Sequence, residues 1–162
     1  MVSKNDAMEA VDTLVRYIEG CEGELREGLS ETPKRVVNSY DEIFSGYSQN
    51  SGEILDSTFN AEGYDGIVLL RDMEFHSTCE HHLQPFSGRG HIAYIPVDRI
   101  VGISKLARLV DVYAKRLQIQ ETLTSQIAET IQRVLDPLGV AVLIDASHQC
   151  MTTRGVHKPE SS

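Results

Sequence analysis

The sequence predicts an α+β fold, and two observations support that prediction. Apolar residues recur at the spacing of an amphipathic helix in four segments, residues 7–19, 33–44, 103–113 and 123–135. Three other segments are short and rich in Val, Ile and Leu, as strands are: residues 67–75, 91–96 and 139–146. The resulting order is helix, helix, strand, strand, helix, helix, strand, which lacks the strict alternation of a parallel α/β sheet.

The first part of the chain predicts two helices. The first is closed by Gly20, and the second starts with Thr32 as N-cap and Pro33 at the first helical position, where a missing N–H costs nothing. We therefore expect residues 1–50 to form an N-terminal helical region and residues 51–162 to form the main domain.

The middle of the chain predicts a loop and then two strands. Residues 46–66 carry Gly, Ser, Asn and Asp with little periodicity, which indicates a surface connection with one short ordered turn. After strand 67–75, Gly88 and Gly90 are expected to flank a turn. The returning strand stops at Pro96, because proline cannot donate to a ladder.

Length and charge exclude several classes of protein. A chain of 162 residues is one domain's worth, and its formal charge of −9 argues against a nucleic acid polymer as partner, since such binding depends on phosphate neutralisation. No segment is apolar over the length of a membrane span, and the polar N-terminus is not a signal peptide. Three widely spaced cysteines indicate a reducing compartment, so we expect a cytoplasmic protein without a membrane partner.

The strongest chemical signal follows strand 67–75 directly. Cys79 and His82 are three residues apart, a spacing at which a thiolate and an imidazole can bind one zinc ion. A third ligand is available in His148-Gln149-Cys150, because alternate residues of a strand share a face. Three protein ligands and one open position are the arrangement of catalytic zinc.

Two histidines, His81 and His148, would remain beside such a metal as proton-transfer candidates. Cys150 alone is explained as well by core packing, because cysteine is among the most buried residue types. The run Cys79-Glu80-His81-His82 is harder to explain in that way, since each of its polar groups would need a buried partner.

The helix predicted at 103–113 opens with Ser104-Lys105-Leu106-Ala107-Arg108, where Ser104 and Arg108 lie one turn apart on one face. A hydroxyl and two cations near a helix N-terminus suit a phosphate group, and Arg154 adds a third cation. A solvated helix face is the competing interpretation. Similarly, Glu121 in the first turn of the next helix is explained by the helix dipole alone.

Several separated motifs occur in one order over nearly the whole chain: Gly28-Leu29, Thr32-Pro33, Arg35-Val36, Cys79-Glu80-His81-His82, Ala93-Tyr94-Ile95-Pro96, Gly102-Ile103-Ser104-Lys105-Leu106-Ala107-Arg108, Gln118-Ile119-Gln120-Glu121, Leu123-Thr124, His148-Gln149-Cys150 and Arg154-Gly155-Val156. Together they resemble type I GTP cyclohydrolase. Each motif alone is weak, but the ordered set is very specific.

The resemblance implies a role for each candidate site residue. Cys79, His82 and Cys150 are implied as zinc ligands, His81 and His148 as acid/base histidines, Glu121 with Gln120 beside it as the guanine contact, and Ser104, Lys105, Arg108 and Arg154 as ribose and triphosphate contacts.

The resemblance also implies a tunnelling fold for the catalytic domain, an antiparallel four-stranded sheet with two helices on one side. It implies an allosteric homodecamer, a dimer of pentamers, with active sites shared between subunits. The implied reaction is hydrolysis of GTP by water activated at zinc, with opening of the imidazole ring as a histidine protonates nitrogen. Formate is then released and the ribose rearranges to give 7,8-dihydroneopterin triphosphate, the entry to folate and pterin synthesis.

Two alternatives and two departures remain. A non-catalytic, zinc-stabilised homo-oligomeric module of the same fold would not need Glu121, His148 and the basic residues together. A relative acting on another purine or pteridine, such as a nitrile reductase, would need a metal-free nucleophilic cysteine and a nicotinamide site.

The family pattern continues after Arg154 with a further strand and helix, so we expect a shortened C-terminal end at Ser161-Ser162. His76 also departs from the family pattern.

Overall fold

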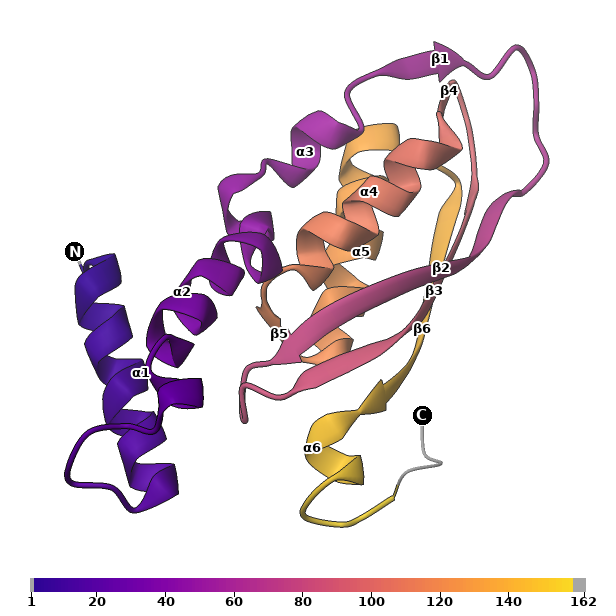
Figure 1. Cartoon of the computed structure of the whole chain (residues 1–162). Coiled ribbons are helices and arrows are strands. Elements are labelled where there is room, and N and C mark those ends of the chain that lie inside the picture. The colour runs from indigo at the N-terminus through magenta and orange to yellow at the C-terminus, as the bar shows by residue number, and fades with distance from the viewer. Residues whose placement is uncertain (1, 159–162) are drawn as a thin grey trace. The chain divides into compact units, whose positions relative to one another are not determined.

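The computed structural model describes residues 2–158, and the chain packs as two units, Met1–Phe44 and Ser45–Ser162 (Figure 1). The domain boundary after residue 50 stays a prediction, because a unit of packing is not by itself a folding domain. The expected shortening at Ser161-Ser162 lies outside the described residues. Among residues 2–158, no helix combines the length and the apolar character that crossing a bilayer requires.

The N-terminal unit holds α1 (Lys4–Glu19), the 3₁₀ turn η1 (Glu27–Leu29) and α2 (Thr32–Ile43). Helix α1 starts earlier than its apolar pattern predicts, because Ser3 and Asp6 form a capping box, and it ends as expected at a left-handed Gly20. The predicted N-cap at Thr32 is wrong by one residue. Glu31 precedes the helix in a right-handed helical conformation and makes no side-chain cap, so Thr32 is already helical.

The larger unit holds η2 (Ser45–Ser48), α3 (Ser51–Ile54), β1 (Thr58–Asn60), β2 (Val68–Cys79), β3 (Pro85–Ile95), β4 (Arg99–Val101), α4 (Ile103–Ala114), β5 (Leu117–Gln118), α5 (Gln120–Leu135), β6 (Gly139–His148) and α6 (Gln149–Thr152). Its four-stranded sheet has the order β5-β2-β3-β6, and β1 pairs with β4 in a separate two-stranded sheet. Helices α4 and α5 lie on one side of the larger sheet (Figure 1). The predicted α+β class is confirmed, although the short β5 pairs with β2 in parallel.

Two expectations about the middle of the chain are wrong. Residues 46–66 contain a short helix and strand β1, and Leu55 in this segment is completely buried, so the connection is anchored to the core. Gly88 and Gly90 lie inside β3 rather than beside a turn. At Gly88 a Cβ would come within 1.9 Å of the Asp145 carbonyl oxygen, so this glycine allows a close approach of β3 and β6.

A bulge in β2 decides which side chains face the helices. The pairing of β2 with β3 shifts register between Leu70 and Met73, and Asp72 in between has a positive φ of 59°. Side chains of a regular strand alternate, so Leu70 and Cys79, an odd number of positions apart, would face opposite sides. The extra residue of the bulge shifts this alternation by one position, so Leu70 and Cys79 face the same side of the sheet. Both side chains then belong to the core between sheet and helices.

Candidate active site and metal centre

The turn between β2 and β3 presents the first two candidate ligands. Cys79 ends β2, and its backbone N–H donates to the carbonyl of Gln84 at 2.8 Å, while Leu83 N–H donates back to the Cys79 carbonyl at 2.9 Å. Leu83 adopts a positive φ of 52°, which tightens the loop. The loop therefore holds His81 and His82 at the end of the sheet, next to Cys79.

Three side chains converge there as a possible metal centre. The ligand atoms of Cys79, His82 and Cys150 all lie within 4.8 Å of one another, and Cys79 Sγ is 3.7 Å from His82 Nδ1. Cys150 lies next to Cys79 and His82, as predicted, but the predicted reason, its position on a strand with His148, is wrong. Strand β6 ends at His148, and Cys150 lies in the short helix α6, so the two side chains do not alternate on one strand.

The donor set of this cluster fits zinc. Two sulfurs and one imidazole nitrogen are ligands that zinc prefers, at bond lengths of about 2.0–2.3 Å, and the spread of the three atoms is compatible with one shared ion. Burial and the neighbouring Cys79 sulfur raise the pKa of the Cys150 thiol, which Arg154 partly opposes. A divalent cation would relieve that repulsion, because thiols bind metal as thiolates.

A cavity of about 240 Å³ opens beside the cluster. Its lining combines the three candidate ligands with residues from the β2–β3 turn, β5, the start of α5, β6 and α6: Cys79, His81, His82, Gln118, Ile119, Gln120, Glu121, His148, Cys150 and Met151. The structure thus brings together seven of the residues that the sequence singled out, Cys79, His81, His82, Gln120, Glu121, His148 and Cys150. They come from the β2–β3 turn, the first turn of α5, and the junction of β6 and α6.

His148 is held rigidly in this cavity. Its ring stacks on Phe86, with centroids 4.6 Å apart and planes 3° from parallel, because the two residues are paired across β3 and β6. Its Nε2 lies 2.8 Å from Oε1 of Gln120. Burial lowers the pKa of His148, and the charge of Glu121 partly offsets that effect. The neutral imidazole is therefore favoured more than in water.

The predicted phosphate contacts lie elsewhere on the chain. Ser104, Lys105 and Arg108 occupy the first turns of α4, which starts beside β4 and runs toward β5 (Figure 1). Arg108 lies six residues and Ser104 ten residues before Ala114, the last residue of α4, which by the rise of a helix is about 9 Å and about 15 Å. None of the three residues lines the cavity. Arg154, in contrast, follows α6 and acts on the Cys150 thiol through its charge.

Comparison with known proteins identifies the family of this chain. The sequence model of the family GTP cyclohydrolase I matches residues 7–162. Proteins named GTP cyclohydrolase 1 from Brucella suis (strain ATCC 23445 / NCTC 10510), Brucella abortus (strain S19) and Brucella melitensis biotype 2 are each 51% identical over 160 residues, which cover 98% of this chain and 74% of each relative. This chain belongs to the GTP cyclohydrolase I family. The resemblance inferred from the ordered motifs is confirmed, and with it the tunnelling-fold class.

Three residues in or beside the cavity were given no role from the sequence, although Gln118 stands in one of the quoted motifs. Gln118 is buried in the cavity wall, and its amide nitrogen donates to the Tyr113 carbonyl and to Gln126 Oε1, each at 2.9 Å. Phe86 supports His148. Met151 lines the cavity from α6. Strand pairing places Gln118 and Phe86, and the turn into α6 places Met151. The sequence alone does not show this, because a lone Gln, Phe or Met in an apolar segment is usually explained by core packing.

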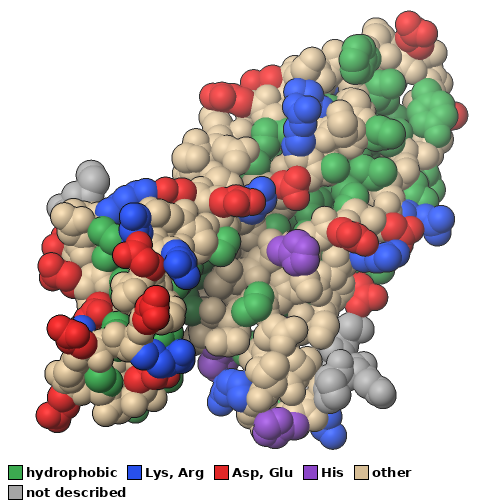
Figure 2. All heavy atoms as spheres, in the orientation of Figure 1, with side chains coloured by type: hydrophobic (Ala, Val, Ile, Leu, Met, Phe, Trp, Pro, Cys, Tyr) green, Lys and Arg blue, Asp and Glu red, His purple; other side chains and the backbone are tan. Residues whose placement is uncertain are grey.

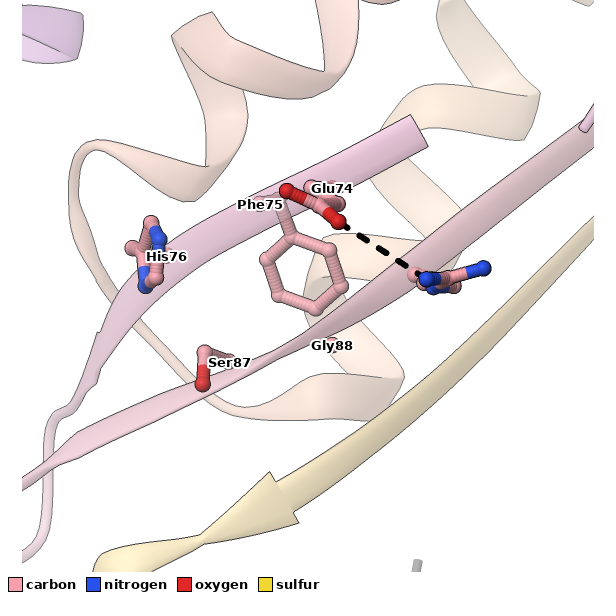
Figure 3. A pocket seen from close by; sticks show the side chains of 6 residues that line it. Glu74, Phe75, His76, Ser87 and Gly88 are labelled. Atoms are coloured by element: carbon pink, nitrogen blue, oxygen red, sulfur yellow. Dashed lines mark ion pairs between the residues drawn. The ribbon is translucent and has the colours of Figure 1, made fainter. Parts of the chain in front are cut away.

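A second cavity of about 240 Å³ lies over β2 and β3, and Figure 3 shows its lining. Arg89 there pairs with Asp72 at 3.4 Å and with Glu74 at 3.7 Å, so its charge is already matched. His76 and Ser87 sit opposite each other in the same lining. The departure of His76 from the family pattern stays a prediction; the residue is exposed and does not line the cavity beside the metal centre.

Proposed function

We propose that this protein is a zinc-dependent GTP cyclohydrolase I, which hydrolyses GTP, opens its imidazole ring, releases formate and forms 7,8-dihydroneopterin triphosphate. The observation that carries the proposal is the single cavity in which a three-ligand cluster, two further histidines and a carboxylate meet. Membership of the GTP cyclohydrolase I family supports the same activity.

Cys79, His82 and Cys150 would hold the metal. Zinc bound by three protein ligands would supply Lewis acidity and lower the pKa of a coordinated water. The protein's own contribution is to keep the three side chains close together. The β2–β3 turn fixes two of them, and the change from β6 to α6 brings the third.

The two spare histidines would move protons. Gln120 orients His148 in the same cavity as the ligands, and burial lowers the pKa of its ring, which favours the neutral form. His148 would therefore first accept a proton from the attacking water and then donate it to the leaving nitrogen of the opening ring. His81 is more exposed, and its Nε2 lies 3.8 Å from Glu80 Oε1, within ion-pair distance when the ring is protonated. A histidine with a carboxylate neighbour at the cavity mouth suits exchange of protons with water.

Glu121 would select guanine. Its carboxylate stands in the first turn of α5 and lines the cavity. A carboxylate can accept two hydrogen bonds from the N1–H and the amino group of guanine, whereas adenine presents no such pair of donors.

The triphosphate would be bound by a local basic group, since the chain as a whole is acidic. Figure 2 shows Lys and Arg side chains scattered among Asp and Glu on the visible face, rather than gathered into one broad patch. Arg154 is near the metal centre of its own chain. Ser104, Lys105 and Arg108 do not line the cavity of their own chain, so we propose that they serve the cavity of a neighbouring copy.

Phosphate contacts from a neighbouring copy would require the protein to assemble. We propose a cytoplasmic, allosteric homodecamer. In the described part of the chain β6 pairs only with β3, so its other edge is open to a strand of another copy. Leu69 and Leu143 are 53% and 62% exposed on strands of the same sheet, which is costly in water and favours burial between copies. Light scattering on the purified protein tests the number of subunits, and the curvature of rate against GTP concentration tests allostery.

The activity itself is tested by incubating the purified protein with GTP, oxidising the products and measuring pterin fluorescence together with formate. We expect both products with GTP and neither with ATP. Zinc retention and assembly without pterin or formate would favour a non-catalytic module of the same fold. Turnover of a different purine or pteridine in place of GTP would assign the second alternative.

A further inference from the structure

Gln120 connects the backbone of β6 to the ring of His148. Its amide nitrogen donates to the carbonyl oxygen of Ile144 at 3.1 Å, and its amide oxygen lies 2.8 Å from His148 Nε2. Both contacts come from the first residue of α5, so one side chain ties the helix start to the strand that delivers His148.

The chemistry of these two contacts decides where the imidazole carries its proton. A backbone carbonyl can only accept, so the side of the Gln120 amide that meets Ile144 must be its NH₂ group. The oxygen must then face His148, and an amide oxygen can only accept. His148 Nε2 therefore bears the hydrogen, and in the neutral ring the lone pair is on Nδ1.

A second contact fixes the ring plane. Phe86 is 1% exposed and stacks flat on His148. The His148 ring therefore cannot tilt out of this plane without disturbing the packing of Phe86 in the core. Gln120 sets the direction of the ring within that plane. Together the two contacts determine which nitrogen is available in the cavity.

We propose that Gln120 is a positioning residue, which holds His148 in the Nε2–H tautomer and makes Nδ1 the atom that exchanges protons with the substrate. This differs from the substrate contact that the family resemblance implied for Gln120. The assignment of a proton-transfer role rests on the proposed function, but the tautomer is a property of the protein without substrate.

The test is ¹⁵N NMR of the zinc-loaded protein labelled in its histidines, combined with kinetics. His148→Gln identifies the His148 signals. In the unaltered protein we expect one fully protonated nitrogen, Nε2, and one lone-pair nitrogen, Nδ1. In Gln120→Leu the two signals should move toward each other, because a neutral imidazole without this acceptor populates both tautomers. In Gln120→Glu, which still accepts from Nε2–H, they should stay apart.

The kinetic arm distinguishes positioning from substrate binding. Gln120→Leu should lower kcat for GTP by about 10–100-fold, the usual cost of losing a group that orients a site residue, with little change in KM. Gln132→Leu is the matched control, since it removes an amide bonded to the Pro137 carbonyl at the far end of the same helix. It should change neither the ring signals nor the kinetics.

Three results would overturn the proposal. A hydrogen on Nδ1 of His148 in the unaltered protein would do so, even if Gln120→Leu failed to fold. Unchanged ring signals in a folded Gln120→Leu would show that the tautomer is set by something else. A raised KM with unchanged kcat would make Gln120 a substrate contact. Absence of GTP turnover in the unaltered protein would instead reject the proposed function and leave the tautomer result standing.

Discussion

The end of the sheet and the start of α4 both carry residues expected in the active site, but they are built in different ways. The cavity collects seven expected residues from three segments far apart in the sequence, and side chains from all three line one space. The basic group Ser104, Lys105 and Arg108 comes from a single helical stretch, and none of the three lines that cavity.

Comparing the two regions indicates which parts of an active site a single chain can form. Metal binding and proton transfer need short, fixed distances, and strand pairing within the chain provides them. Recognition of a long, flexible triphosphate can be divided between copies, because a charged side chain acts over several ångströms. Substitutions in the two regions should therefore have different effects on zinc content, turnover and GTP binding.

The largest effect is expected from the metal ligands. Cys79→Ala and Cys150→Ala should each lose the zinc and reduce turnover to background, because two remaining ligands rarely hold catalytic zinc. Metal analysis of the purified variants measures this directly. Cys21→Ala is the control, since Cys21 belongs to the N-terminal unit, and should keep its zinc. Full zinc content in both ligand variants would reject the metal centre.

His148→Ala should keep its zinc, assemble and bind GTP, yet turn over about 10²–10⁴-fold more slowly, the usual cost of removing a general acid or base. Zinc content, GTP binding and the rate of formate release are measured on one preparation. Loss of zinc would make His148 a ligand. An unchanged rate would mean that His81 or water carries the proton.

Glu121→Ala should weaken GTP binding by up to two charge-assisted hydrogen bonds, about 1.5–3 kcal/mol each, while zinc and fold persist. Glu129→Ala is matched, since it removes an exposed carboxylate further along the same helix, and should bind normally. Calorimetric titration with GTP gives both values. Normal binding in Glu121→Ala would leave its carboxylate as a helix-dipole partner only.

Lys105→Ala or Arg108→Ala should weaken GTP binding by about 1.5–3 kcal/mol and guanosine binding hardly at all, because the lost contacts are to phosphate. Lys34→Ala, in the N-terminal unit, is the control. Equal losses for GTP and guanosine would place the group on a solvated face.

Mixing two defective chains tests the proposed sharing of sites. Lys105→Ala and His148→Ala, assembled together, should recover part of the activity, since one copy offers an intact cavity and its neighbour an intact α4. Mixed assemblies that form but stay inactive would mean that both regions act within one chain.

The smallest effect is expected at Gly88, away from both regions. Gly88→Ala should lower the free energy of unfolding by about 1–3 kcal/mol, because its Cβ would overlap the Asp145 carbonyl and push β3 from β6. Gly139→Ala, where a Cβ meets no atom within 4 Å, should be nearly neutral. Denaturant unfolding compares the two. Equal stability would show that the strands adjust without cost.

The sequence by itself determined the helices, the main strands, the Cys79 and His82 pair and the family. These depend on periodicity and short spacing, which act within a few residues, and on an ordered set of motifs. The spacing of Ser104 and Arg108 on one helix face was equally local. Predictions failed where a residue type occurs in two kinds of structure. Gly88 and Gly90 were assigned to a turn but lie inside β3, and residues 46–66 were assigned to a loop but contain α3 and β1.

Only the tertiary structure decided how these local pieces meet. The bulge at Asp72 turns Cys79 inward, and pairing of β3 with β6 places His148 on Phe86. The turn into α6 brings Cys150 to the metal centre, and the placement of α4 leaves Ser104, Lys105 and Arg108 out of the cavity lining. Each of these depends on strand register and chain direction, which long-range pairing fixes and no local pattern encodes.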